Sequence, residues 1–503
     1  MSNNQTRVNL YTNIATMVAN TLVVIYYTPY LVDKLGVSVY GVLPLALIIN
    51  QYIMVATGML TNAFTRFYSV AIQKNDYGEA SKVFTTSLVA TLFIIIIITP
   101  ALAGVVLKVD TLFQIPRGFE ESARWLFSLT IVSFYFSIVS SFLNVTLYAL
   151  NRLDLMNYMK IVRQSLKLVF TVFLFEGVGI ELHFVGLANL IVEIIVFFWS
   201  IYYFFKYKPV QVKISLQFYS KITLFAILGM ASWVLIQELG DTLLYRTDNI
   251  LINHYLGSSE SGRLGAISEL GGYIKTVVQV VGSLFGPLIL IAYAKDNHKE
   301  VEDLTVNQSL IVGCLAAVLC GVTAGVGPEL LSLWLDDSFL SYSHWLFLKL
   351  FPIPFYAAGG VMSFVYKAWN KVKKPAIYTL MIGFIDIIVL LAVCQIVSIE
   401  QMDEAILCIS CIFSLVQSYL LGLYCVYKIY PGTKNSFIRL TGKLIIVFVI
   451  SFFIAYVGKS YWKITGFTTL CMQCMIYGIL SFVILIFILN KEERLAMINV
   501  YKR

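Results

Sequence analysis

The chain has 503 residues, of which 59% are hydrophobic and only 13% are charged, and its formal net charge is +8. An ordinary soluble domain carries about 25% charged residues, so this composition excludes a soluble globular protein and indicates a membrane protein. We expect the excess of Lys and Arg to lie at the inner surface of a bilayer, and not to bind nucleic acid.

Predominantly apolar stretches of about 20 residues can cross a bilayer as helices. In chain order we find about fourteen of them, at residues 9–32, 41–63, 83–107, 125–148, 161–177, 184–205, 223–253, 262–294, 304–327, 344–367, 376–397, 404–428, 440–458 and 467–490. Their connections are too short to hold a soluble domain. The first stretch is longer than a signal-peptide core and has no small-residue cleavage site, so we expect it to be retained. The sequence therefore predicts an all-α, polytopic membrane protein.

Lys and Arg gather in the loops on the side that holds both termini, and they are sparse in the loops on the other side. Because positive residues favour the cytoplasmic side, we expect both termini in the cytoplasm.

Short motifs recur about halfway along the chain. "LGVSVYG" (residues 35–41) returns as "LGSSESG" (residues 256–262), 221 residues later, and Phe64 matches Phe285 at the same offset. "ALNR", which ends at Arg152, matches "AWNK", which ends at Lys371, at nearly that offset. Such order and spacing predict two copies of one six-helix unit.

An even number of spans places both copies the same way up, so we expect a pseudo-twofold axis along the membrane normal. This predicts an N-terminal lobe at 1–210 (helices 1–6), a C-terminal lobe at 211–430 (helices 7–12), and two further helices with a tail at 431–503. Parallel repeats of this kind are typical of transporters, in which the substrate site lies between the halves and rocking gives alternating access.

The seventh predicted span carries four charges: Glu238, Asp241, Arg246 and Asp248. A charge inside a membrane span is costly and marks a functional site by default. Glu238 and Asp241 fall near the midplane, and Asp241 and Asp248 lie about 20° apart around the helix. Arg246 lies off this acidic stripe.

The eighth span returns with Lys275 near the midplane and Glu269 level with Arg246. Small and polar residues share one face of it, which lipid cannot satisfy: Ser268, Gly272, Lys275, Gln279, Gly282 and Gly286. Polar stripes on the first, second and fourth spans also predict a wet central cavity, and they contain Asn9, Thr16, Asn20, Tyr27, Asn50, Thr57, Ser140 and Asn144.

Cations in a low-dielectric cavity suit an anionic head group such as pyrophosphate, so Arg246 and Lys275 are candidate substrate contacts. Gln279, Asn20, Asn50 and Asn144 are candidate polar contacts. Alternatively, Arg246 and Lys275 only neutralise Asp248, Glu269, Glu238 or Asp241 and lock two helices together.

Glu238 or Asp241 is a candidate site for a coupling H⁺ or Na⁺. Glu193 and Asp386, alone near the middle of their spans, are candidates for a proton site or for a hydrogen bond to a neighbouring helix. Pro287, Pro352 and Pro354 are expected to kink their helices.

Enzyme signatures are lacking in the sequence. "CISC" (408–411) and "CMQC" (471–474) imitate zinc spacing, but Cys is an ordinary small residue of membrane cores. We see no nucleophile with a base, no Gly-rich phosphate loop and no nucleotide-binding domain. We therefore expect no enzyme and no cofactor or metal, with energy coming from a H⁺ or Na⁺ gradient, the membrane potential or a partner.

Three motifs together resemble a known family: "YLVDKLGVSVYG", "YALNRLDLMNY" and "LYRTDNILINHYLGSSESGRLGAIS". In the last, Arg246, Asp248 and Gly262 look like the family's Arg-x-Asp and following Gly. The family is that of the oligosaccharide flippases of bacterial polysaccharide export, the O-antigen or Wzx-type branch of the MATE-like MOP superfamily. The resemblance covers roughly residues 8–430.

This resemblance implies a two-lobed, inverted-V fold in the bacterial cytoplasmic (inner) membrane. It implies that the protein flips an undecaprenyl-pyrophosphate-linked oligosaccharide, such as an O-antigen unit of lipopolysaccharide, from the inner to the outer leaflet. It also implies a cationic cavity and, as partners, a polysaccharide polymerase and a chain-length regulator. Lipid II flippases, a sister branch, resemble this family in carrying several Arg residues in the cavity of the first lobe. Here no Arg lies inside the first two spans, and Arg66 stands only at the cytoplasmic exit of the second, which argues against lipid II and for a different glycan.

Other functions stay open. A MATE-type multidrug or cation exporter would prefer acidic and aromatic walls, and the acidic stripe of the seventh span favours it. The lipid-linked glycan could instead be a teichoic acid precursor or lipid II. A membrane enzyme would need a larger outer loop with catalytic carboxylates.

Overall fold

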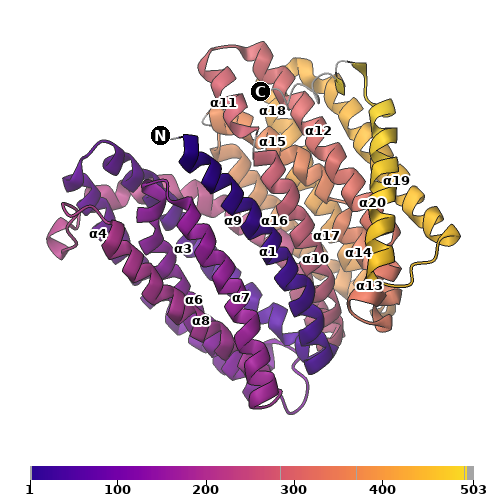
Figure 1. Cartoon of the computed structure of the whole chain (residues 1–503), viewed down its shortest axis with the longest axis horizontal. Helices are drawn as coiled ribbons and strands as arrows, with labels where there is room; N and C mark the ends of the chain where they lie inside the picture. The colour runs from indigo at the N-terminus through magenta and orange to yellow at the C-terminus, as the bar shows by residue number, and fades with distance from the viewer. Residues whose placement is uncertain (1–2, 284, 370, 492, 495–503) are drawn as a thin grey trace. The chain divides into compact units, whose positions relative to one another are not determined.

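A computed structural model describes residues 3–283, 285–369, 371–491 and 493–494. These described residues form helices and no β-strand, which confirms the predicted all-α fold (Figure 1). Eleven of the described helices are long and apolar enough to cross a membrane, or twelve if the two parts of α9 (Lys221–Leu256), bent by 41°, are one span. The other two predicted spans are also helical, but they are richer in charged and polar residues.

The chain divides into two compact units, the first comprising Met1–Thr242 with Asn249–Gly262 and the second Leu243–Asp248 with Arg263–Arg503. The lobe boundaries expected at residues 210 and 430 stay a prediction. Unit 1 holds most of α9 together with α1 (Asn3–Leu35), α2 (Val37–Tyr40), α3 (Val42–Gln73), α4 (Tyr77–Leu107), α5 (Val109–Leu112), α6 (Glu120–Ala149), α7 (Leu153–Gly177), α8 (Leu182–Tyr207) and a 3₁₀ turn (Leu216–Phe218).

Unit 2 holds nearly all of α10 and the helices after it. They are α10 (Ser258–Ser283), α11 (Gly286–Ala294), α12 (His298–Gly325), α13 (Gly327–Trp334), α14 (Ser343–Leu350), α15 (Ile353–Ala368), α16 (Lys373–Ile396), α17 (Met402–Leu415), α18 (Leu421–Ile429), α19 (Lys434–Tyr461) and α20 (Phe467–Ile488), with 3₁₀ turns at Asp337–Tyr342, Ile399–Gln401 and Pro431–Thr433 and a π turn at Val416–Leu420. The predicted eighth and tenth spans are each broken in two, between α10 and α11 and between α14 and α15, near the prolines that were expected to kink them.

Unit 1 is held together by α6, which packs along both α8 and α3, and by α1, which packs on α7. Aromatic rings fill the contact between α3, α4 and α6: Phe64 stacks on Phe142 with ring centroids 4.3 Å apart and meets Phe84 edge-on at 5.7 Å. All three rings are fully buried. Each such pair is worth about 0.5–1.5 kcal/mol beyond its buried area, so this cluster fixes the register of the three helices.

The internal repeat is present in the backbone. Gly36 and Gly257, which match at the predicted offset, both have positive φ (75° and 98°) where one helix ends and the next begins. A second matched pair was not predicted: Asn75 and Asp296 also share the left-handed conformation, with φ of 56° and 52°.

The helix caps that follow this second pair match as well. Asp76 caps α4 by accepting a hydrogen bond from the Glu79 backbone amide at 2.9 Å, and Asn297 caps α12 in the same way through Glu300 at 3.2 Å. The two copies therefore start their third helices with the same turn and the same type of cap.

The two copies of the Leu-Gly motif also touch one another. Gly262 lies so close to the start of α2 and α3 that a Cβ atom there would be 2.3 Å from the Val37 carbonyl oxygen and 3.0 Å from the Gly41 α-carbon. A Cβ on Gly41 would lie 1.9 Å from the Ser258 carbonyl oxygen. Since backbone atoms cannot move aside as a flexible side chain can, neither position accepts a larger residue. We call this contact the glycine contact.

The two helices outside the repeat, α19 and α20, pack on α12 within unit 2. Gly321 and Gly325 of α12 face the Phe448 and Phe452 carbonyl oxygens of α19, and a Cβ atom on either glycine would lie 2.6 Å from the facing oxygen. Small residues that let two backbones approach are the usual basis of helix association in membranes. They fix α19 on the bundle.

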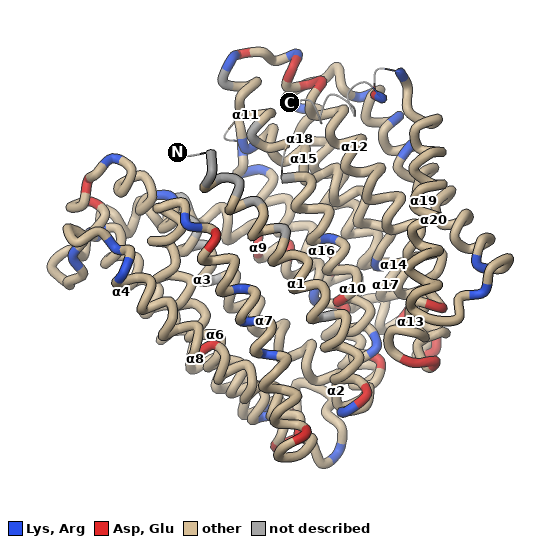
Figure 2. Tube along the Cα trace, viewed as in Figure 1, with Lys and Arg blue, Asp and Glu red and all other residues tan. Residues whose placement is uncertain are grey.

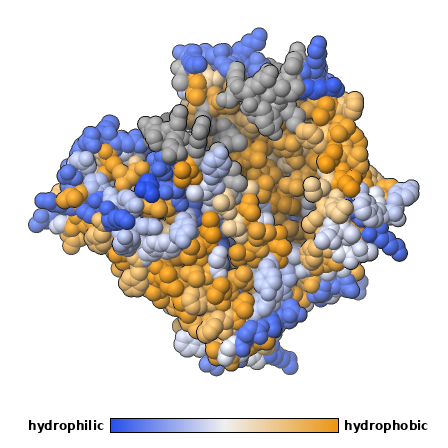
Figure 3. Space-filling model, in the orientation of Figure 1, coloured by the Kyte–Doolittle hydropathy of each residue, from blue (hydrophilic) through white to orange (hydrophobic). Residues whose placement is uncertain are grey.

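Charged residues lie mostly at the ends of helices and in loops (Figure 2). On the face shown in Figure 3, apolar side chains cover the middles of the helices and hydrophilic ones gather near their ends. This distribution is expected where lipid surrounds the middles of helices and water their ends.

Candidate functional site

Unit 2 contains a cavity of about 140 Å³, with room for on the order of ten water-sized groups. Five helices line it: α9, α10, α14, α15 and α17. Its polar and charged side chains are Tyr245, Arg246, Asp248, Ser268, Lys275, Lys349, Tyr356, Ser410 and Ser414. The structure thus brings together three of the residues predicted from the sequence, Arg246, Asp248 and Lys275.

The Asp248 carboxylate forms an ion pair with the Lys349 ammonium of α14. Only 3% of the Asp248 side chain and 21% of the Lys349 side chain are exposed. The structure thus gives Asp248 a partner that the sequence did not suggest, and pairing of this carboxylate with Arg246 or Lys275 stays a prediction. Because the Asp248 carboxylate is buried, it depends on such a partner more than an exposed carboxylate would.

Two tyrosine rings cover the Lys275 ammonium. Its Nζ lies 3.6 Å from the ring centroid of Tyr245 and 3.9 Å from that of Tyr356. Ammonium groups are attracted to the negative face of an aromatic ring, by about 2 kcal/mol or more where water is excluded. The rings thus hold the charge of Lys275 in the cavity.

Asp386 of α16 has no exposed surface and lies within electrostatic range of Asp248 and Lys349. Neither of its carboxylate oxygens has a hydrogen-bond partner among the described residues. A hydrogen bond to a neighbouring helix, one of the two roles expected for this residue, is therefore not observed in the described part of the chain. A buried carboxyl in this state is suited to hold a proton or a small cation.

Unit 1 contains a larger cavity, of about 590 Å³, between α3, α6 and α7. Arg66, Lys160 and Arg163 line it, together with hydroxyl and amide groups such as that of Asn144. Arg163 lies 3.2 Å from the buried carboxylate of Glu193 on α8. That cavity is therefore cationic and rich in hydrogen-bonding groups.

Three residues of the polar stripe of α1, Asn9, Thr16 and Tyr27, contact α7 or the turn before it, so this part of the stripe does not face a wet cavity as predicted. Thr16 donates to the Asn157 carbonyl oxygen at 3.3 Å, and the Tyr27 and Thr171 hydroxyls lie 3.1 Å apart. In lipid these groups need protein partners, and α7 supplies them.

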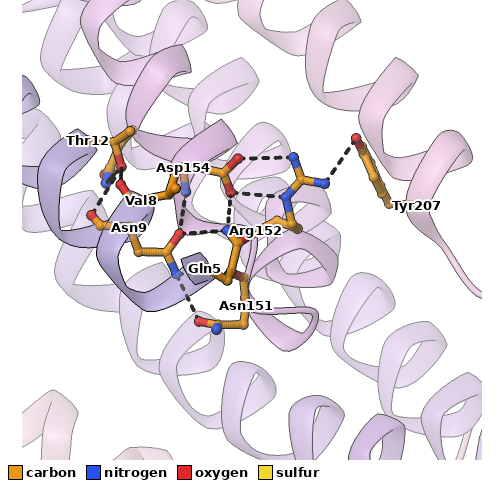
Figure 4. A network of polar contacts seen from close by, with 9 residues as sticks. Gln5, Val8, Asn9, Thr12, Asn151, Arg152, Asp154 and Tyr207 are labelled. Atoms are coloured by element: carbon orange, nitrogen blue, oxygen red, sulfur yellow. Dashed lines mark hydrogen bonds and ion pairs between the residues drawn. The ribbon is translucent and has the colours of Figure 1, made fainter. Parts of the chain in front are cut away.

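At the start of α1 the same contact becomes a network (Figure 4). The Asn9 amide donates to the Asn151 carbonyl oxygen and accepts from the Asp154 backbone amide, both at 3.1 Å. Arg152, in the turn before α7, forms two 3.0 Å hydrogen bonds with Asp154, which raise the pKa of Arg152 above its usual range. Gln5 donates to the same carboxylate at 3.0 Å. This network ties the start of α1 to the turn between α6 and α7.

The other predicted site residues lie as follows. Asn144 lines the unit 1 cavity and donates to the Ser200 hydroxyl at 3.2 Å. Asn20 and Asn50 are half-buried, and their side-chain oxygens have no partner among the described residues. Both lie outside the linings of the two cavities.

Of the predicted acidic residues, Glu238 is exposed and Asp241 half-buried, and neither lines the two cavities. Glu269 accepts a hydrogen bond from Tyr273 at 3.1 Å on its own helix. Gln279 is exposed.

Sequence reasoning missed three cations, Arg66, Lys160 and Arg163. Arg66 was placed at the cytoplasmic exit of the second span and was not selected as a site residue; it lies in α3, which continues to Gln73. Lys160 and Arg163 were not selected, although they stand three residues apart on α7 and therefore share a face. That spacing was visible in the sequence.

Three comparisons place the chain among known proteins. No family model matches it. Over 384 residues it is 24% identical to the uncharacterized membrane protein EpsK of Bacillus subtilis (strain 168), covering 76% of this chain and 75% of that protein.

Among solved structures, the inward closed conformation of the lipid II flippase MurJ matches with a TM-score of 0.65 and 17% identity, over 96% of this chain and 98% of that one. An inward-facing multidrug resistance MATE family transporter of the MOP superfamily matches with a TM-score of 0.63 and 14% identity, over 83% of this chain and 96% of that one. The chain is a multi-pass membrane protein whose fold is that of MATE transporters and of MurJ.

Proposed function

We propose that this protein is a flippase, not an enzyme, that carries an undecaprenyl-pyrophosphate-linked oligosaccharide across the bacterial cytoplasmic membrane. In this proposal both termini lie in the cytoplasm, and alternating access moves the lipid-linked glycan from the inner to the outer leaflet. A polysaccharide polymerase and a chain-length regulator would act on the glycan afterwards. The substrate would be a repeat unit of a surface polysaccharide such as an O-antigen.

One observation carries the proposal: each unit surrounds a cavity with three cations. They are Arg66, Lys160 and Arg163 in unit 1 and Arg246, Lys275 and Lys349 in unit 2. Among the described residues that line the two cavities, the only carboxylate is that of Asp248, which is paired with Lys349. Such walls attract an anion and repel an organic cation.

The types of side chain fit the two parts of the substrate. Arg offers a planar fork of donors that matches phosphate oxygens, and Lys offers a point charge. In unit 1 the cations stand beside polar groups suited to sugar hydroxyls, which include Thr61, Thr65, Ser69, Gln73, Ser141 and Asn144. The unit 2 cavity, at about 140 Å³, has room for a small anionic group and not for an oligosaccharide.

We propose further that a H⁺ or Na⁺ gradient drives transport and that the coupling ion binds at Asp386. This residue is favoured over Glu238 and Asp241 because its buried carboxylate has no hydrogen-bond partner among the described residues and lies near the Asp248–Lys349 pair. Asp386→Asn should therefore remove the dependence of transport on the ion gradient. Unchanged ion dependence in this variant would contradict the assignment.

The function is tested in a strain lacking the gene, complemented with wild type, Lys275→Ala, Arg246→Ala or Lys160→Ala. Lipid-linked oligosaccharide is measured on each leaflet at matched protein levels. We expect it to accumulate on the inner leaflet and to be cleared only by wild type and by a control, Lys82→Ala, which alters an exposed lysine of unit 1. Normal surface glycan in the deletion strain would refute the proposal.

The same strains separate the alternatives. Drug resistance on overexpression, with no change in surface polysaccharide, would identify a multidrug exporter. Accumulation of a teichoic acid precursor or of lipid II, in place of a repeat unit, would keep the flippase and change its substrate.

A further inference from the structure

A π turn, Val416–Leu420, joins α17 to α18 in unit 2. A π turn holds one more residue than an α-helical turn, so it shifts the side chains that follow it around the helix axis. Such turns are frequent at functional sites. No proline explains this one, since the segment reads "VQSYL".

The π turn is fitted to its neighbour α15. A Cβ atom on Gly359 would lie 1.8 Å from the Ser418 carbonyl oxygen, so only glycine allows this approach. The backbone of α15 at Gly359 therefore packs directly against the Ser418 carbonyl group of the π turn. The distortion is therefore built into the packing of unit 2.

The π turn directs Gln417 toward Tyr245 of α9. The Tyr245 hydroxyl donates to the Gln417 Oε1 at 3.4 Å and accepts from the Ser414 hydroxyl at 3.4 Å. Two residues at the junction of α17 and the π turn thus hold one phenol from both sides. The orientation of the Tyr245 ring depends on this turn.

That ring is one of the two that cover Lys275. The cavity therefore contains two lysines held in different ways: Lys349 is bound to the Asp248 carboxylate, and Lys275 lies between the faces of Tyr245 and Tyr356. A phosphate oxygen binds an ammonium group more strongly than an aromatic ring does, because both partners are charged. A phosphate ligand can displace the rings.

Resting on the proposed function, we propose that Tyr245 and Tyr356 form a clamp that keeps the Lys275 ammonium in the cavity until a diphosphate group takes it over. Gln417 and the π turn are positioning elements that act through Tyr245. The clamp and its π turn make Lys275 the cation that exchanges partners during binding, while the Asp248–Lys349 pair stays in place.

The test measures how fast Lys275 reacts with a small amine-acylating reagent, in the full-length protein in lipid nanodiscs, by peptide mass spectrometry. Tyr245→Leu, which removes the covering ring, should raise the rate at Lys275 by about tenfold. Gln417→Ala and Tyr245→Phe, which remove only the tether, should raise it by about two- to fivefold. Gln401→Ala, an exposed glutamine in a 3₁₀ turn, serves as the matched control, and the exposed Lys428 as the internal reference.

Unchanged acylation of Lys275 in both Gln417→Ala and Tyr245→Phe would overturn the clamp, whether or not Tyr245→Leu folds. The ligand is tested with inorganic pyrophosphate and with a polyprenyl diphosphate in the nanodisc. Slower acylation of wild-type Lys275 with both probes supports recognition of the diphosphate itself. Protection by the lipid alone assigns the site to a lipid-linked diphosphate, and no protection by either refutes the takeover.

This readout is separate from transport. If the clamp variants and the diphosphate change the acylation of Lys275 while a deletion strain exports its glycan normally, the proposed function fails and the clamp stands. If export fails in the deletion strain but acylation is unaffected by every variant, the clamp fails and the function stands.

Discussion

Replacing Lys349 by Met should destabilise the protein strongly, because it removes the ammonium group that pairs with the buried Asp248 carboxylate. Only 3% of the Asp248 side chain is exposed, so water can replace the lysine only in part. Breaking a buried pair from one side costs about 3–5 kcal/mol. The nearby Asp386 carboxyl, itself buried, adds repulsion to this cost when both groups are ionised.

The double variant Asp248→Asn/Lys349→Met tests whether charge is the cause. It removes both ions and keeps side chains of similar size, so we expect it to recover most of the lost stability. The free energy of unfolding is measured by denaturant titration in mixed micelles for the wild type, both single variants and the double variant. A Lys349→Met variant within about 1 kcal/mol of wild type, or a double variant as unstable as the single ones, would refute the reasoning.

Three further predictions concern other parts of the chain. Gly262→Ala places a Cβ atom against two backbone segments and should lower the free energy of unfolding by about 1–3 kcal/mol or more, which a lower yield of folded protein would show. Gly466 has open space around it, so the control Gly466→Ala should have a much smaller effect. Gly321→Val should separate α19 from α12, which limited proteolysis of the segment before α19 would detect as faster cleavage. Lys160→Glu should abolish export at a normal protein level, because it reverses one of the three positive charges of the unit 1 cavity. The control Lys82→Glu, at an exposed lysine, should leave export intact. Equal export by the two variants would exclude this cavity from transport.

The fold could be predicted from the sequence because its determinants are local. Hydropathy located the helices, and the repeat of "LGVSVYG" as "LGSSESG" located two equivalent helix ends with positive φ at Gly36 and Gly257. The ends of the helices were harder to predict, because hydropathy locates the apolar stretch that crosses the membrane, and a helix can continue beyond that stretch. For example, α3 continues past its apolar part to Gln73, after which Asn75 turns the backbone and Asp76 caps α4.

The candidate site was predicted only in part. Arg246, Asp248 and Lys275 were selected because charges in a span are conspicuous, and they do line one cavity. The pairing of Asp248 with Lys349, 101 residues away, depends on how α9 packs against α14, which no local pattern encodes. Tyr245 and Tyr356 were missed because a tyrosine in a membrane helix is ordinary until the charge that it covers is known.

The glycine contact also constrains how this chain can change over time. Gly41 and Gly262 hold equivalent places in the two copies. Each glycine packs against the backbone of the other copy, at the other glycine and four residues before it. A pair of this kind behaves as one position: a larger residue at either site cannot be compensated by shrinking the other, since glycine is already the smallest. The packing therefore demands glycine at the same place in both copies of the repeat, whatever residues stand at other matched positions.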